Sequence, residues 1–136
     1  MKTRNLFCIL IALTTAGCSG YRVFDEVELP EIKQKPDGSL VVVVEPTFES
    51  INKNIIQAKC VLCHSQGGPA EHVHIANYED LIATAVAPGD PEGSPLYLIV
   101  QPDSEPRMPP RTSTVAPLSE QQIAAIKDWI TAGALK

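Results

Sequence analysis

The stretch Cys60-Val61-Leu62-Cys63-His64 decides how this 136-residue chain is interpreted. Two cysteines separated by two residues, with a histidine directly after the second, form the attachment signature of a c-type haem. In that chemistry both thiols add across the haem vinyl groups, and the two-residue gap places both sulfurs on one edge of the porphyrin. His64 then lies beneath the ring as an iron ligand.

A Cys-x-x-Cys pair has two competing interpretations, a thiol redox pair and one half of a zinc site. A thioredoxin-like pair is expected in a βαβ context, which is absent around Cys60. A zinc site needs more ligands, and beyond His64 the chain offers only His72 and His74. The sequence therefore favours one covalent haem attached through Cys60 and Cys63.

Amphipathic helices are predicted on both sides of this motif. The first begins after Thr47 as N-cap and carries an apolar stripe at helical spacing: Phe48, Ile51, Ile55 and Ile56. The last begins with a capping box, Ser119 to Gln122, and ends near Gly133. Its predicted buried face consists of Ile123, Ile126, Trp129 and Ile130. Two shorter helices are predicted between them, one over 77–85 and one that starts at Ser94-Pro95.

Composition limits the size of the core and the kinds of partner. Twelve prolines and eight glycines indicate much irregular backbone, and a small loop-rich domain usually needs a metal or cofactor to stabilise it. The formal charge is −5, and removal of Lys2 and Arg4 with the leader leaves nine basic and sixteen acidic residues, near −7. An acidic chain without basic patches argues against nucleic acid as a partner.

Residues 1–17 are predicted to be a secretory signal peptide. Lys2 and Arg4 precede a short apolar run, 6–13, which is too short to span a bilayer. Small residues then lead to Cys18, an arrangement that resembles a bacterial lipobox, although Thr15 stands where that pattern usually has an aliphatic residue. The resemblance implies that Cys18 becomes a lipidated N-terminus, whereas the alternative is a secreted chain with an unmodified Cys18.

Residues 18–45 are interpreted as an extended tether that contains a β-hairpin. The turn sequence Pro36-Asp37-Gly38 separates Val27–Lys33 from the β-branched run Leu40–Val44. Pro30 would restrict the first strand to the edge of a sheet.

Several further segments resemble class I c-type cytochromes, and in particular the short cytochrome c modules of planctomycete-type and bacterial surface proteins. The matching segments are Pro88-Gly89-Asp90-Pro91, Ser94-Pro95-Leu96-Tyr97, Arg107-Met108-Pro109-Pro110 and Leu118–Ala134. The resemblance covers about residues 47–136. It implies an all-α domain over 46–136, with crossed N- and C-terminal helices around one covalent haem c.

The resemblance also implies a sixth iron ligand. Met108 is the only methionine after the leader, and prolines on both sides stiffen its loop. Met/His ligation is common in cytochromes c, so Met108 is the expected partner of His64 on the iron. His72 and His74 are the alternative ligands, since bis-His ligation also occurs with haem.

The expected function is that of an exported, membrane-anchored monohaem electron carrier rather than an enzyme. Expected partners are redox proteins and the membrane, which Cys18 would reach through its lipid. The expected location is the periplasmic side of the inner or outer membrane, with the cell surface as an alternative. Two other hypotheses stay open: a haem-based sensor or peroxidase-like protein with a displaceable sixth ligand, and an interaction module whose haem is structural.

Overall fold

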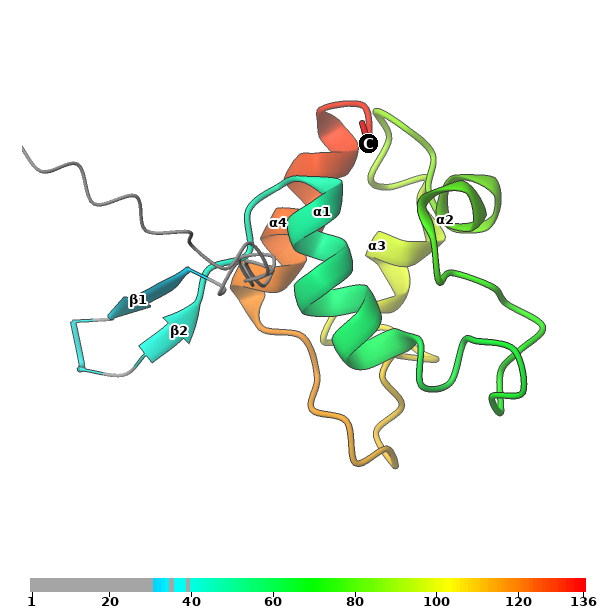
Figure 1. Cartoon of the computed structure of the whole chain (residues 1–136), viewed down its shortest axis with the longest axis horizontal. Helices are drawn as coiled ribbons and strands as arrows, with labels where there is room; N and C mark the ends of the chain where they lie inside the picture. Colours follow the sequence, from blue (N-terminus) through cyan, green and yellow to red (C-terminus); the bar gives the residue numbers. More distant parts are fainter. Residues whose placement is uncertain (1–30, 35, 39) are drawn as a thin grey trace, which may run out of the picture.

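The computed structural model describes residues 31–34, 36–38 and 40–136. The predicted leader, Cys18 and the first part of the tether lie outside these residues. In chain order the elements are β1 (Ile32–Gln34), β2 (Leu40–Val42), α1 (Phe48–Ile51), η1 (Asn52–Cys60), α2 (Tyr78–Thr84), α3 (Pro95–Ile99) and α4 (Glu120–Thr131). Figure 1 shows a helical domain with a small hairpin projecting from one side. The predicted all-α class is confirmed.

The N-terminal helix starts as predicted, with the hydroxyl of Thr47 accepting a hydrogen bond from the Ser50 N–H at 3.3 Å. It continues without a break into η1, a π-helix, the winding in which N–H groups donate to carbonyls five residues back, as the Val61 N–H does to the Ile56 carbonyl at 3.0 Å. This wider winding was not predicted. It places Cys60 beside Ile55, whose carbonyl oxygen lies 3.7 Å from the Cys60 Sγ atom. Cys60 therefore continues the fully buried stripe of Ile51, Ile55 and Ile56.

Helix α4 is capped at both ends by its own sequence. The Ser119 hydroxyl accepts from the Gln122 N–H at 3.3 Å, and the Gln122 side chain accepts from the Ser119 N–H at 3.0 Å, which confirms the capping box. The helix ends at Thr131 with Ala132 as its C-cap, and Gly133 follows with φ +97°. Its buried face is the predicted one with Ala125 added: Ile123, Ala125, Ile126, Trp129 and Ile130.

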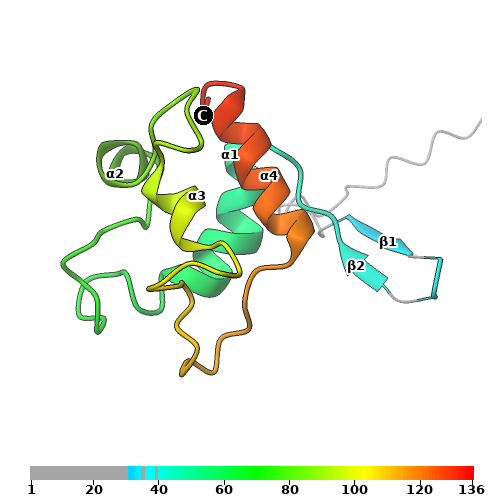
Figure 2. The same ribbon diagram turned by 180° about the vertical axis from the view of Figure 1, so that it is seen from behind.

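The first and last helices pack against each other, as Figures 1 and 2 show from opposite sides. Phe48 at the start of α1 contacts Trp129 of α4, with ring centroids 6.1 Å apart. Phe48 also meets Tyr78 of α2 edge-on at 5.1 Å. Aromatic pairs of this kind add to the stabilisation from apolar burial, so these three rings join three helices at one end of the domain.

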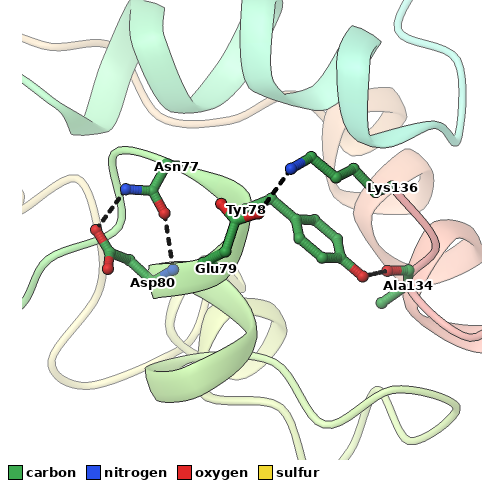
Figure 3. Close-up of polar contacts among 6 residues, drawn as sticks. All are labelled: Asn77, Tyr78, Glu79, Asp80, Ala134 and Lys136. Atoms are coloured by element: carbon green, nitrogen blue, oxygen red, sulfur yellow. Dashed lines mark hydrogen bonds and ion pairs between the residues drawn. The ribbon is translucent and has the colours of Figure 1, made fainter.

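The C-terminus is fastened to the start of α2 (Figure 3). The Tyr78 hydroxyl donates to the Ala134 carbonyl at 3.0 Å, and the Lys136 ammonium donates to Glu79 at 2.6 Å. This bond lowers the pKa of the Glu79 carboxyl below its ordinary value. Asn77 caps the helix by accepting from the Asp80 N–H at 2.9 Å.

The hairpin is shorter than predicted at its second strand. Ile32 pairs with Val42 and Gln34 with Leu40 in antiparallel register. Val43 and Val44, predicted to continue β2, lie beyond its end and are buried, at 8% and 5% exposure. The Val43 N–H still donates to the Glu31 carbonyl at 2.8 Å, whereas the Val44 side chain belongs to the core of the helical domain. Residues 27–30 of the predicted first strand lie outside the described residues.

Helix α3 is fixed at its start by the residue that precedes it. Ser94, the residue before Pro95, is fully buried. Its hydroxyl accepts from the Ala87 N–H at 2.8 Å and donates to the Asp90 carbonyl at 2.8 Å. The side chain therefore ties the preceding loop to the start of α3.

Within the described part of the chain, no helix has both the length and the apolar character needed to cross a membrane.

Candidate functional site

The predicted haem-binding residues share one cavity. Cys60, Cys63, His64 and Met108 all line a space of about 400 Å³. His72 lines it too, whereas His74 is not part of its wall. The fold thus brings together side chains from the end of η1, the following loop and the proline-rich loop after α3. A space of this size is typical of a site for one small ligand or cofactor.

The wall of this cavity is largely apolar. Its hydrophobic and proline residues are Ala70, Val73, Ile75, Ala85, Pro95, Leu96, Ile99, Val100, Pro109, Pro110, Val115 and Leu118. Lys59 is the one lysine among the lining residues, and no aspartate or glutamate lies among them. Such a wall suits a mostly apolar ligand whose polar groups are anionic.

Both motif cysteines carry free thiols rather than forming a disulfide with each other. The Cys60 side chain is half-buried at the end of η1. Burial raises the pKa of its thiol from an ordinary 9.0 to about 11, although Lys59 beside it acts in the opposite direction. Cys60 therefore stays protonated at neutral pH in the folded chain.

The His64 ring is oriented by a backbone carbonyl. Its Nδ1 atom lies 3.2 Å from the Val73 carbonyl oxygen. A carbonyl can only accept a hydrogen bond, so Nδ1 carries the hydrogen and the Nε2 atom of the neutral ring keeps its lone pair. This is the tautomer that an iron ligand needs, and a second hydrogen bond of this type is typical of metal-binding histidines.

The loop after the motif folds back to supply that carbonyl. The Ala70 N–H donates to the Cys63 carbonyl at 3.0 Å, and the Val73 N–H donates to Ala70 at 3.1 Å. Gly68 packs so closely that a Cβ atom there would lie 2.5 Å from the Cys63 carbonyl oxygen. Glycine at this position allows the chain to return against the motif.

Met108 reaches the cavity from the opposite loop. Its backbone N–H donates to the Ile99 carbonyl of α3 at 2.8 Å, and the next residue, Pro109, is buried. Further along this loop, the Lys59 ammonium donates to the carbonyls of Ala116 at 3.0 Å and Pro117 at 3.4 Å. The loop is thereby fixed to α3 at one point and to η1 at another.

These residues fit a covalently attached haem. The cavity has an apolar wall, two free thiols, a histidine whose Nε2 lone pair is available, and a thioether. Cys60 and Cys63 would hold the group, with His64 and Met108 as the iron ligands. The described residues contain no cluster of three or more histidine, cysteine, aspartate or glutamate side chains suited to a metal ion.

Two contributions to the site were not predicted. The Val73 carbonyl gives no sequence signal, because every residue has a backbone carbonyl and only the loop's path selects this one. Lys59 lines the cavity and holds the opposite loop. The sequence signal that could have identified Lys59 is its position directly before Cys60.

Part of the chain matches a known protein family. Residues 60–112 match the family described as Planctomycete cytochrome C, a segment that runs from the first motif cysteine past Met108. The resemblance stated from the sequence is thereby confirmed for this segment. No curated protein and no solved structure matches the chain significantly.

Proposed function

We propose that this chain is an exported monohaem c-type cytochrome that carries single electrons. Cys60 and Cys63 would bind the haem covalently, and His64 and Met108 would ligate its iron. The observation that carries the proposal is that these four side chains line one apolar cavity, within a segment that matches a cytochrome c family.

A bound haem supplies an iron that accepts and releases one electron. The chain's own residues set how readily it does so. The hydrogen bond from His64 Nδ1 to the Val73 carbonyl keeps Nε2 directed away from that carbonyl and raises its basicity. The Met108 thioether favours the reduced iron and raises the potential. With His64 and Met108 both on the iron, no iron position would be open to a substrate, which favours a carrier over a sensor or a peroxidase.

Met108 is preferred over the two remaining histidines as sixth ligand. Its backbone is anchored to Ile99, and its neighbour Pro109 is buried in the wall. His72 lines the same cavity but is an exposed side chain on the loop that already supplies the Val73 carbonyl. His74 does not line the cavity, so it is the weakest of the three candidates.

The proposal extends to location. The signal-like residues 1–17 and the lipobox-like Cys18 support an exported chain anchored by lipid on the periplasmic side of the inner or outer membrane. Residues 19–45 would then space the haem domain from the bilayer. Redox proteins at that membrane are the expected electron donors and acceptors.

The test begins with the full chain produced alongside a haem-attachment system. A pyridine haemochrome assay should show one covalent haem c per chain, and Cys60→Ser with Cys63→Ser should abolish it. A chain that carries no covalent haem would refute the proposal.

The sixth ligand is tested on the same protein. The oxidised form should show the near-infrared sulfur-to-iron band, which Met108→Ala should remove and the matched control His72→Ala should retain. Carbon monoxide should bind the reduced wild type slowly and Met108→Ala rapidly. Rapid binding to the wild type would favour the sensor or peroxidase hypothesis.

A further inference from the structure

Arg107, the residue directly before Met108, has a buried group without a partner. Its Nε atom is excluded from solvent and makes no hydrogen bond to any described residue. A buried charged donor without an acceptor is costly, because the lost hydration is not replaced. Among the described residues it is the only buried side-chain nitrogen or oxygen atom in this state.

The surroundings of Arg107 favour an anionic partner that is not a protein side chain. The ion pairs of the described residues join Lys33 to Glu31 and Lys136 to Glu79, far from this loop in sequence. The cavity wall formed by the next residues contains no carboxylate. Arg111 in the same loop differs, since its guanidinium donates to the Pro102 carbonyl at 3.2 Å and is exposed.

We propose that the Arg107 guanidinium binds a propionate carboxylate of the haem. This inference rests on the proposed function, since the carboxylate belongs to that cofactor. The planar guanidinium presents paired N–H donors that match the two oxygens of a carboxylate, and Nε is one of these donors. Arg107 would thus be a positioning residue that connects the loop of Met108 to the cofactor and keeps the propionate ionised.

The experiment measures the reduction potential of the holoprotein against pH for the wild type, Arg107→Met, Arg107→Lys and the control Arg111→Met. A propionate held by Arg107 should titrate at low pH, because a neighbouring guanidinium typically lowers a carboxyl pKa by about 1–3 units. In Arg107→Met the inflection in potential should therefore move up by at least about one pH unit. Arg107→Lys should give a smaller shift, and Arg111→Met none.

A pyridine haemochrome assay on each variant separates the two proposals. Unchanged inflections in Arg107→Met with full haem content would overturn the role of Arg107 and leave the electron-carrier proposal intact. If neither Arg107 variant accumulates, the inference is tested on the wild-type holoprotein instead. Redox difference infrared spectra with ¹³C-propionate haem should then show an ionised carboxylate at pH 5, and a carboxylate that titrates as if free in water would overturn the inference.

Discussion

Replacing Ser94 with alanine should destabilise the domain, because this fully buried hydroxyl makes two hydrogen bonds at once. It accepts from the Ala87 N–H and donates to the Asp90 carbonyl, both at 2.8 Å. A buried hydrogen bond contributes about 0.5–1.5 kcal/mol net, and a partner left buried and unpaired costs more. Ser94→Ala should therefore lower the free energy of unfolding by about 2–3 kcal/mol. For a domain of this size, that corresponds to a fall in Tm of about 10–20 °C.

The measurement is guanidinium unfolding of the holoprotein, followed by far-ultraviolet circular dichroism. The matched control is Ser104→Ala, whose hydroxyl donates to the Pro106 carbonyl at 3.0 Å at the surface. Its free energy of unfolding should change by less than about 0.5 kcal/mol. If Ser94→Ala unfolds at the same denaturant concentration as Ser104→Ala, the hydroxyl does not fasten α3 in the way the structure indicates.

Two further predictions concern the motif itself. Gly68→Ala should destabilise the holoprotein by about 1–3 kcal/mol, because the added Cβ would lie 2.5 Å from the Cys63 carbonyl. Gly67→Ala meets no atom within 4 Å but has φ +79°, so its cost should be near 1 kcal/mol; equal denaturation midpoints for the two variants would contradict the close approach. In the folded haem-free chain carrying Cys63→Ser, alkylation of Cys60 by iodoacetamide should rise about tenfold per pH unit until the thiol pKa of about 11. In the unfolded chain this thiol has its ordinary pKa of 9.0, so it ionises at a lower pH there than in the folded chain. The free energy of unfolding of this variant should therefore fall by about 2–3 kcal/mol between pH 9 and 11. An alkylation plateau near pH 9 would mean that Cys60 is not buried.

The terminal helices could be predicted because their signals are local. The spacing of Ile51, Ile55 and Ile56 predicted the buried stripe of the first helix, and Ser119 and Gln122 predicted the start of the last. These features depend only on residues within one or two turns of each other. The π-helical winding of η1 was not predictable in this way, since the same apolar spacing is compatible with α-helix until the whole segment is packed.

In the candidate site, too, some residues could be predicted from the sequence and others depend on the folded chain. The motif and Met108 were identified from residue types and from the resemblance, and their roles as ligands stay predictions. The structure adds that both lie on one cavity. The Val73 carbonyl and the unpartnered Arg107 Nε depend on how two loops fold back, which residue type does not reveal. The early end of β2 has a similar cause, since burial of Val44 in the core of the domain takes precedence over strand propensity.

If haem is attached at Cys60 as proposed, the burial of this residue implies an order of events during maturation. A thioether bond forms most readily from an accessible, ionisable thiol, whereas in the closed domain this thiol is half-buried and protonated. In an exported chain, as proposed, residues 60–64 would also leave the ribosome and the export channel well before residues 120–131 of α4. Attachment is therefore expected on the open chain, with closure of the helices as the later step. The cofactor would be present as the core forms around it, rather than inserted into a finished fold.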